Sequence, residues 1–577
     1  MRIVFKYLKP YIFPIIFSVT FLLGQVFTEL TLPNLMSEIV DKGILLQGID
    51  PKDQMSVIYN LGLKMLGVSL LSVFCSIGVS FLATRIAAGV SRNMRRDLFK
   101  KVNDFASSEI DKFSTASLIT RNTNDVQQIQ NFVTMGLRMM LFAPFMGIGS
   151  VVMALSKSHS LAWVIVVAIL VIIGLLIVLL IVALPKFKIM QSLVDRLNLV
   201  SREDLSGMLV IRAFSNEGYE EERFDVANKD LTFTTRFVQR ALAFMLPGVQ
   251  IVMTFTQVAL IWFGAKLVGA SSLAIGDMLA FLQYAVHIMI SFLFVSVIFI
   301  ILPRAQVSAN RIREVLETEI SIRDKENAEV LSDVKGTVEF KNVSFCYADD
   351  SEKVLDNISF KAEPGKTTAF IGATGSGKTT LINLIPRFYD VTEGEILIDG
   401  HDVRDVTLES LRDSIGYVPQ KPFLFSGTIE SNVKYANSDA DVDFALKIAQ
   451  AKEIVDAKAE GVHSPIAQGA ANVSGGQKQR LSVARAIAKN APIYIFDDSF
   501  SALDFKTDSA LRHALAENIT ATILIVAQRV STIMNADQIV VLSEGKIVGL
   551  GTHEELLEKC AAYREICESQ LSKEELA

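Results

Sequence analysis

The stretch that most constrains the fold is residues 372–380, which read GATGSGKTT and fit the phosphate-binding pattern G-x-x-x-x-G-K-[ST]. The apolar, β-favouring residues 367–371 precede it, and residues 381–385 can continue as a helix until Pro386. A strand, a glycine loop and a helix are the setting in which this pattern binds phosphate, because backbone N–H groups and the helix N-terminus surround the anion. The stretch therefore predicts an α/β nucleotide-binding domain.

The motif also assigns roles to its residues. We expect Lys378 to reach the β- and γ-phosphates and Thr379 to hold Mg²⁺. The alternative is a chance match in a glycine-rich turn, which the flanking strand and helix patterns disfavour. The nucleotide-binding candidates are Gly372, Thr374, Gly375, Ser376, Gly377, Lys378, Thr379 and Thr380.

Composition separates the chain into two parts. Half of the 577 residues are hydrophobic, and the excess lies before about residue 303 in long uncharged runs. A chain of this length is expected to hold at least two domains. The net charge of −6 gives no indication of a nucleic-acid partner. The four cysteines form neither a zinc spacing nor a C-x-x-C pair, which favours reduced thiols.

Apolar runs of about 20 residues predict membrane-spanning helices. We place six, at roughly residues 11–33, 57–84, 133–155, 161–184, 242–268 and 277–302. Buried soluble helices are a poor alternative, because residues 161–184 hold no charge. The basic, amphipathic residues 1–10 are typical of a helix that lies on the membrane surface.

The links between spans predict the orientation. The links after the second and fourth spans are long and rich in Lys and Arg, whereas the short links hold only Lys42, Lys52 and Lys157. The long links and both termini are therefore expected in the cytoplasm. Each long link fits two helical extensions joined by a turn, at residues 113–118 and 215–219, although a loosely packed loop is the alternative.

Few polar residues interrupt the spans. Glu29 and Arg138 are candidates for a substrate pathway, because ionisable groups within spans usually face a bundle interior or a water-filled cavity. The alternatives are an interhelical pair or positions near the membrane interface.

Further motifs follow the phosphate loop. Gln420 comes after a strand-like segment and is placed to contact Mg²⁺ and an attacking water. Asp497 ends an apolar buried strand, where parallel α/β sheets carry their ligand groups, and is a second candidate for Mg²⁺. A second glycine turn opens a helix and forms an anion site, with residues Ser474, Gly475, Gly476 and Gln477.

In this order, the spans and motifs resemble the ATP-binding cassette (ABC) exporters over nearly the whole chain. The resemblance implies a membrane α-helical bundle of the type IV exporter class, with six transmembrane helices and long cytoplasmic extensions, followed by an α/β P-loop ATP-binding cassette. We expect a transmembrane domain at 1–303, a linker at 304–335 and a nucleotide-binding domain at 336–577. The family also implies two paired half-transporters, with each ATP held between one phosphate loop and the partner's 474–477 signature. Tyr347 would stack on adenine, and the turns in the long links would rest on the cassettes.

Two positions depart from the family pattern. Asp498 stands where the family usually has a catalytic Glu, and Gln528 stands where it usually has a switch His. The shorter carboxylate retreats from the attacking water by about an ångström, and misplacement on that scale can cost about 100-fold in rate. Gln528 is neutral at any pH and cannot handle protons as imidazole does. Harmless variation is the alternative at each position.

These departures resemble the degenerate-site subunit of heterodimeric bacterial multidrug exporters. They predict a chain in the bacterial inner membrane that binds ATP and Mg²⁺ at a slow site and completes a competent site on a partner half-transporter. The expected cargo is amphipathic drugs or lipids, with membrane lipid as a second partner. A peptide or siderophore transporter on the same architecture, or a regulatory ATP-binding subunit, remains the alternative.

Overall fold

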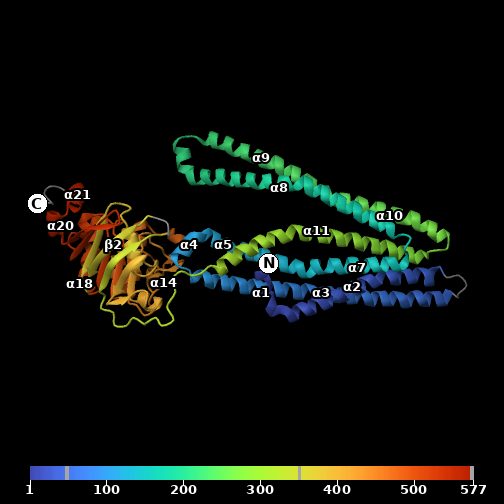
Figure 1. The fold of residues 1–577 in the computed structure, drawn as a ribbon, viewed down its shortest axis with the longest axis horizontal. Helices are drawn as coiled ribbons and strands as arrows, with labels where there is room; N and C mark the ends of the chain where they lie inside the picture. Colours follow the sequence, from blue (N-terminus) through green and yellow to red (C-terminus); the bar gives the residue numbers. More distant parts are fainter. Residues whose placement is uncertain (46–50, 348–351, 572–577) are drawn as a thin grey trace. The chain divides into compact units, whose positions relative to one another are not determined.

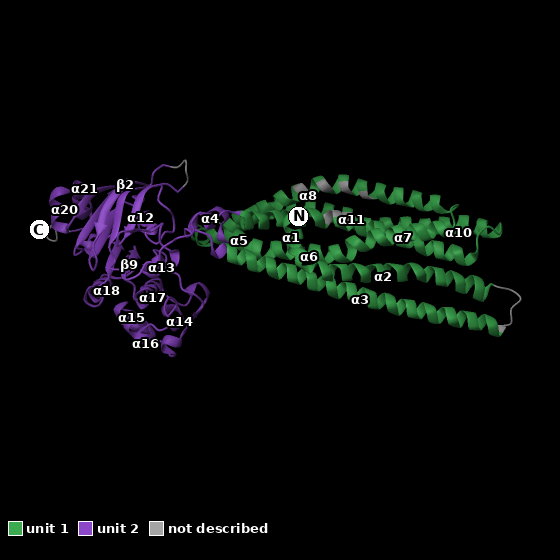
Figure 2. Cartoon of the chain, turned by 60° about the horizontal axis from the view of Figure 1, so that its bottom comes forward, with its two compact units in different colours: residues 1–101, 116–317 green, residues 102–115, 318–577 purple. Residues whose placement is uncertain are grey.

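The computed structural model describes residues 1–45, 51–347 and 352–571 (Figure 1). Contacts between residues divide the chain into two compact units (Figure 2), of which unit 1 is residues 1–101 with 116–317 and unit 2 is residues 102–115 with 318–577. The short segment 102–115, which interrupts unit 1 in the sequence, therefore belongs with the C-terminal unit.

Unit 1 is built from helices. Because backbone groups in lipid must be hydrogen-bonded within their own segment, long apolar sequences fold as helices there. Helical turns η1 (Lys9–Tyr11), η2 (Ile39–Ile44), η3 (Arg121–Asp125) and η4 (Gly136–Met140) connect several of them. The helices are α1 (Arg2–Leu8), α2 (Ile12–Glu38), α3 (Pro51–Asn103), α5 (Thr115–Thr120), α6 (Val126–Met135), α7 (Leu141–Lys157), α8 (Ala162–Ala213), α9 (Glu217–Ala243), α10 (Met245–Gly269) and α11 (Ile275–Glu317).

The predicted number of spans is confirmed. Among the described residues, six helical stretches are long and apolar enough to cross a membrane. Several extend well beyond a bilayer, since the 53 residues of α3 cover about 80 Å against a hydrocarbon core of about 30 Å. The helical extensions predicted in the long links are thus continuous with the spans. The six stretches are Arg2–Ile44, Lys52–Asn103, Thr115–Lys157, Ala162–Ala213, Pro247–Gly269 and Ile275–Val295.

The first long link turns earlier than the predicted residues 113–118. The chain leaves α3 at Asn103 and enters the short helix α4 (Ser107–Phe113), whose first turn is capped by the Glu109 carboxylate. Ser114 has a positive φ of 58°, and α5 begins at the next residue. Residues 115–118 are therefore helical rather than part of the turn. The second predicted turn, at 215–219, is right only in its first two residues, because α8 ends at Ala213 and α9 begins at Glu217. The chain turns around Ser215, which has φ of 50°, and residues 217–219 are already helical.

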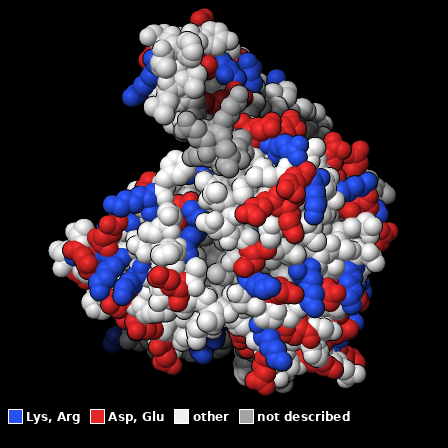
Figure 3. Space-filling view, turned by 90° about the vertical axis from the view of Figure 1, so that its left-hand side faces the viewer, with Lys and Arg blue, Asp and Glu red and all other residues white. Residues whose placement is uncertain are grey.

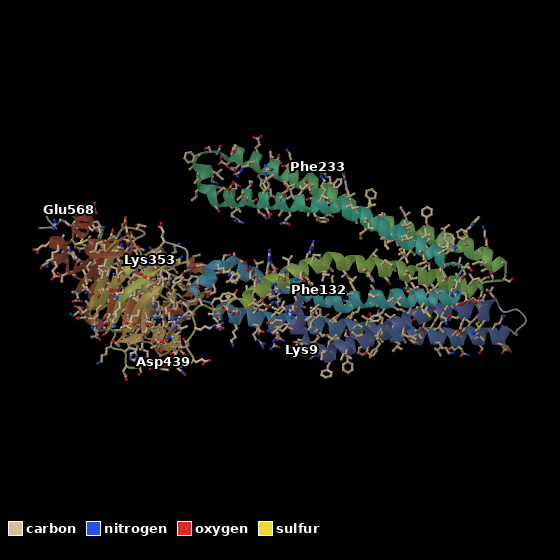
Figure 4. All side chains as sticks on the ribbon, in the orientation of Figure 1. Lys9, Phe132, Phe233, Lys353, Asp439 and Glu568 are labelled. Carbon is tan, nitrogen blue, oxygen red and sulfur yellow. The ribbon has the colours of Figure 1, made fainter. Side chains whose placement is uncertain are left out.

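Helices α8 and α9 form a long pair that diverges from α2, α3, α7 and α11 in Figure 1. Large apolar side chains on this pair remain exposed. Phe233, labelled in Figure 4, is 77% exposed, and Leu209 is 84% exposed. The pair therefore carries apolar surface that the described part of this chain leaves uncovered.

Unit 2 contains a six-stranded sheet in the order β12-β11-β3-β10-β9-β6 and a four-stranded antiparallel sheet in the order β2-β1-β4-β5. In the larger sheet all neighbouring pairs except β11–β12 are parallel. The strands are β1 (Val338–Phe345), β2 (Leu355–Ala362), β3 (Thr367–Gly372), β4 (Glu393–Ile398), β5 (His401–Asp402), β6 (Ile415–Val418), β7 (Gly427–Thr428), β8 (Pro465–Ile466), β9 (Ile493–Asp497), β10 (Thr522–Val526), β11 (Gln538–Ser543) and β12 (Lys546–Gly551).

Helices surround these sheets. Alternate residues of the central strands enter two hydrophobic cores, so that Phe370 belongs to one core and Ala369 and Ile371 belong to the other. The helices are α12 (Lys378–Leu384), α13 (Leu408–Asp413), α14 (Ile429–Val433), α15 (Val442–Ile448), α16 (Lys452–Asp456), α17 (Gly475–Ala488), α18 (Phe505–Asn518), α19 (Val530–Ile533), α20 (His553–Lys559) and α21 (Ala561–Gln570), with α4 added from the first long link.

On the face shown in Figure 3, charge is mixed rather than segregated. Basic and acidic side chains alternate over the face shown in Figure 3. Many of them form exposed ion pairs, such as Lys353 with Glu393 at 2.8 Å and Lys341 with Glu395 at 3.2 Å. Exposed pairs of this kind contribute little to stability, about 0–1 kcal/mol each.

The segment between α11 and β1 lies along unit 2 and is held there by hydrogen bonds. Asp399 accepts three consecutive backbone N–H groups, from Lys335 at 2.6 Å, Gly336 at 3.2 Å and Thr337 at 2.8 Å. Burial of this carboxyl opposes its ionisation, but the backbone donors outweigh burial and hold the pKa of Asp399 below its usual value. The ionised carboxylate therefore fixes the entry into β1.

This anchor predicts a pH-dependent contribution to stability. Because the folded-state pKa of Asp399 is depressed, the stabilisation is present above the unfolded-state pKa, about 3.9, and is lost as pH falls through the folded-state pKa. We expect Asp399→Asn to lower the free energy of unfolding of unit 2 by about 1–2 kcal/mol at pH 7, with the difference closing below about pH 4. Denaturant unfolding across this pH range measures it.

The matched control is Asp333→Asn, because Asp333 is an exposed carboxylate of the same segment. It should leave the free energy of unfolding nearly unchanged. A destabilisation by Asp399→Asn that is the same at pH 3 and pH 7 would contradict the role of the ionised carboxylate.

Candidate functional site

The phosphate loop joins β3 to α12 as predicted. Two of its glycines have left-handed backbones, with φ of 84° at Gly375 and 94° at Gly377. Side chains rarely adopt this conformation, and a Cβ at Gly377 would also lie 2.7 Å from Leu355 Cδ2. The loop therefore needs glycine at Gly377 both for its backbone conformation and for its close approach to β2.

Lys378 folds back over the loop that precedes it. Its Nζ donates to the carbonyl oxygens of Gly372 and Ala373, each at 2.8 Å, and lies 3.4 Å from Ser376 Oγ. Burial lowers the pKa of Lys378, while the nearby carboxylates of Asp498 and Asp497 oppose that shift. The ammonium is thus held above the loop, next to both acidic groups of the site.

Thr379 and Asp497 meet across the edge of the sheet. Thr379 Oγ1 donates to Asp497 Oδ1 at 3.0 Å, and Asp497 is only 1% exposed. Burial, together with the neighbouring charge of Asp498, raises the pKa of Asp497 to about 6, against the hydrogen bond from Thr379. A hydroxyl beside a buried carboxylate is the oxygen donor set that Mg²⁺ prefers, with phosphate and water oxygens completing its shell. These two residues fit the predicted metal site.

The structure brings Gln528 and Gln420, two of the predicted catalytic residues, to the carboxylate of Asp498. Gln528 Nε2 donates to Asp498 Oδ2 at 2.7 Å, and Gln420 Nε2 lies 3.4 Å from the same oxygen. Asp498 is 8% exposed and has a left-handed backbone, with φ of 46°. The carboxylate that would face an attacking water is therefore held by amide donors.

Tyr347 lies beside the phosphate loop. Its hydroxyl is 2.8 Å from Thr380 Oγ1, and half of the residue, 51%, is exposed. The edges and faces of Phe345 and Tyr389 contact its ring, with centroids at 4.9 Å and 5.3 Å. The predicted adenine contact is thus part of an aromatic cluster.

A cavity of about 360 Å³ collects most of the predicted nucleotide site. Sequence reasoning missed Val354 and Val526, two apolar residues that line it, because short apolar residues at strand ends carry no motif. The predicted residues in its wall are Thr374, Gly375, Gly377, Lys378, Thr379, Thr380, Gln420, Asp498 and Gln528.

The signature residues are not part of this cavity wall. Ser474 caps the 14-residue helix α17, accepting from the Gln477 backbone N–H at 3.4 Å, while the Gln477 side chain accepts from Ser474 N–H at 3.1 Å. A Cβ at Gly475 would meet open space. Among the described residues, the backbone donors at the start of α17 are therefore not part of the cavity that holds the phosphate loop.

Glu29 and Arg138 lie on neighbouring segments but at different depths. Gln25 Nε2 donates to Glu29 Oε1 at 2.9 Å, and Glu29 is half-buried, whereas Arg138 is exposed on η4. Leu30, next to Glu29 in the chain, packs directly against Gly149, since a Cβ on Gly149 would lie only 2.4 Å from Leu30 Cδ1. Arg138 precedes Gly149 by about three helical turns, or about 16 Å. Their positions do not bring the two charges together.

Comparison with known families matches both halves of the chain. Residues 15–293 match the model of the ABC transporter transmembrane region, and residues 355–501 match the model named ABC transporter. The second match contains the phosphate loop, Gln420, the signature, Asp497 and Asp498.

Individual proteins resemble the chain over almost its full length. An uncharacterized ABC transporter ATP-binding protein of Mycobacterium tuberculosis is 39% identical, with 98% of this chain and 97% of that protein covered. An ATP-dependent lipid A-core flippase of Syntrophus aciditrophicus is 33% identical over 88% of this chain and 84% of its own length. The solved structure of a bacterial Atm1-family ABC exporter with ATP bound shares the fold, with a TM-score of 0.80, 23% identity and coverage of 98% and 99%.

The metal ligands can be tested by substitution. Asp497→Asn keeps an acceptor for the Thr379 hydroxyl but removes the charge that would hold Mg²⁺. We expect the Mg²⁺-dependent gain in ATP affinity to fall by about tenfold or more, while ATP affinity in EDTA changes by less than about twofold. Isothermal titration calorimetry with Mg²⁺ or EDTA measures both affinities.

Thr379→Ser, which keeps the hydroxyl, serves as the control and should bind Mg²⁺·ATP like the unaltered chain. An equal loss of affinity by Asp497→Asn with and without Mg²⁺ would show that Asp497 supports the loop rather than the metal.

Proposed function

The chain belongs to the ABC transporters, as a half-transporter homologous to bacterial exporters in which one transmembrane domain is fused to one nucleotide-binding domain, and from this premise we propose a more specific role. The chain is one subunit of a heterodimeric exporter that moves amphipathic drugs or lipids out across the bacterial inner membrane. Its own ATP site turns over slowly, and its signature completes the fast site of the partner. The nucleotide-binding domain and both termini lie in the cytoplasm.

The observation that carries the slow-site proposal is the hydrogen bond from Gln528 Nε2 to Asp498 Oδ2, at 2.7 Å. A general base must offer a carboxylate oxygen to the attacking water. Here that oxygen already accepts from one amide, with a second amide at 3.4 Å, on a side chain one methylene shorter than Glu. Gln528 also cannot take up a proton. The phosphate-binding part of the site, by contrast, has all its motif residues.

Two features support a partner half-transporter. The start of α17 presents its backbone donors outside the chain's own cavity, so the anion that they would bind belongs to another ATP. The α8–α9 pair also leaves large apolar side chains exposed, including Leu205 at 74% and Phe214 at 78%. These residues lie among charged ones such as Arg202 and Glu203, so burial against protein suits them better than lipid.

ATPase activity tests the slow site. We expect the full-length chain purified alone to hydrolyse ATP at least about tenfold more slowly than its complex with a half-transporter that carries Glu and His at the two positions. In that complex Asp498→Asn should change turnover little, whereas Gln replacing the partner's Glu should stop it. An ATPase activity of the isolated chain comparable to that of the complex would contradict the slow-site proposal.

A gain-of-function variant provides the matched control. Asp498→Glu combined with Gln528→His, in the chain alone, restores both groups while the signature is intact. Its turnover should rise by about 10–100-fold. Gln528→Asn, which keeps an amide, should not raise it.

For the transported molecule, Glu29 is the stronger of the two candidates. It is a half-buried acid about 14 Å from the end of α2, and its hydrogen-bond partner Gln25 is neutral. Arg138 lies about 28 Å along the helix from Lys157, near the opposite membrane surface. An acid within the bundle favours amphipathic cargo with a cationic group.

Transport assays with inside-out vesicles test this assignment. Glu29→Gln should reduce ATP-dependent uptake of a cationic amphipathic dye by about fivefold or more and leave uptake of a neutral dye within about twofold. Glu38→Gln is the control, since Glu38 pairs with Lys42 at the end of α2, at 3.5 Å. Equal losses for both dyes would contradict a charge-selective role. ATP binding with no ATP-dependent uptake of any dye would instead favour a regulatory subunit.

A further inference from the structure

An aromatic cluster in unit 2 connects the nucleotide cavity to the short helix α4. Tyr347, whose hydroxyl is 2.8 Å from Thr380, contacts Tyr389 edge to face, with ring centroids 5.3 Å apart and ring planes at 87°. Phe345 fills the angle between them, at 4.9 Å from Tyr347 and 5.7 Å from Tyr389. Three rings in mutual contact restrict one another's orientation.

Tyr389 is also held by a hydrogen bond at its hydroxyl. Its hydroxyl donates to Asp111 Oδ2 at 3.2 Å. Burial, followed by the charge of Asp111, raises the pKa of Tyr389 to about 12, so the hydroxyl keeps its proton at neutral pH. The adjoining Arg387 is 4% exposed and donates to Asp390 at 2.7 Å, which holds the backbone on both sides of Tyr389.

Asp111 itself stands on a well-anchored element. It lies on α4, where Glu109 accepts from the backbone N–H of Ala106 at 2.7 Å and of Ser321 at 3.2 Å. The rings of Phe105 and Phe113 stack on each other at 5.9 Å. In the chain, α4 follows the long helix α3, which ends at Asn103.

We propose that Tyr389 and Asp111 are positioning residues of the nucleotide site, which hold the Tyr347 ring for the base and thereby link adenine binding to α4. The proposal rests on the proposed contact of Tyr347 with adenine. Among the described residues, neither Tyr389 nor Asp111 lines the cavity at the phosphate loop, so we expect the link to concern the base and not the phosphates. By thermodynamic reciprocity, whatever shifts α4 changes affinity for ATP by the same factor as ATP shifts α4.

Binding to the full-length chain, purified alone in nanodiscs, separates the base from the phosphates. The two probes are Mg²⁺·ATP and Mg²⁺·tripolyphosphate, which lacks the base. Tyr389→Phe keeps the ring and removes the hydroxyl, and Asp111→Ala removes the acceptor. We expect each to weaken ATP binding by about three- to tenfold, the double variant to be no weaker than either single one, and tripolyphosphate binding to be unchanged.

Asp104→Ala is the matched control, because Asp104 is an exposed carboxylate just before α4. It should leave both affinities unchanged. The proposal would be overturned by additive losses of ATP affinity in the double variant, or by an unchanged ATP affinity. Equal losses for ATP and tripolyphosphate would also overturn it, because they would indicate damage to the phosphate loop.

Hydrogen exchange of the α4 amides tests the link itself. ATP should slow exchange in residues 107–113 of the unaltered chain, tripolyphosphate should not, and Tyr389→Phe should abolish the effect of ATP. Protection by both ligands, or by neither, would contradict the link. Tyr347→Ala separates the adenine contact of Tyr347 from the positioning role of Tyr389. If this variant does not weaken ATP binding relative to tripolyphosphate binding, the proposed adenine contact is wrong. If it does weaken ATP binding in this way while Tyr389→Phe does not, only the positioning role is wrong.

Discussion

The parallel register of β3, β10 and β9 is the constraint on which the nucleotide site depends. Val526 of β10 pairs with Phe370 on one side and with Asp497 on the other, so the three strands end at the same edge of the sheet. The phosphate loop leaves from β3, Asp498 follows β9 and Gln528 follows β10. The common edge of the sheet therefore brings together residues that lie more than 100 positions apart in the sequence.

At that edge, the buried acids of the site are stabilised by a nearby ammonium and by hydrogen-bond donors. Two adjacent acids, Asp497 and Asp498, lie near the ammonium of Lys378, and each acid has separate hydrogen-bond donors. Thr379 binds Asp497, while the two glutamines bind Asp498. Buried charges require such partners, because an unpaired carboxylate in a low-dielectric setting costs several kcal/mol. The contacts that stabilise Asp498 are also the contacts that occupy the oxygen a general base would use.

In unit 1 the corresponding constraint is the satisfaction of backbone groups in an apolar setting. Pro33 lies inside α2 and has no N–H to donate to the carbonyl of Glu29, four residues earlier. The Tyr284 hydroxyl donates to the Leu30 carbonyl at 2.9 Å, in a fully buried position. Helix α11 thus adds a hydrogen bond to α2 one residue beyond the Glu29 carbonyl, and α2 continues through its proline.

The sequence by itself determined the six spans, the phosphate loop and the candidates for the metal and the acid, because apolar length and glycine spacing are local properties. The departures at Asp498 and Gln528 were also visible there. Only the tertiary structure decided that Gln528 donates to Asp498, that residues 115–118 are helical and follow the short helix α4, and that Tyr389 joins Tyr347 to Asp111. These facts depend on side chains from distant segments meeting at one place, and no period or spacing within a single segment carries that information.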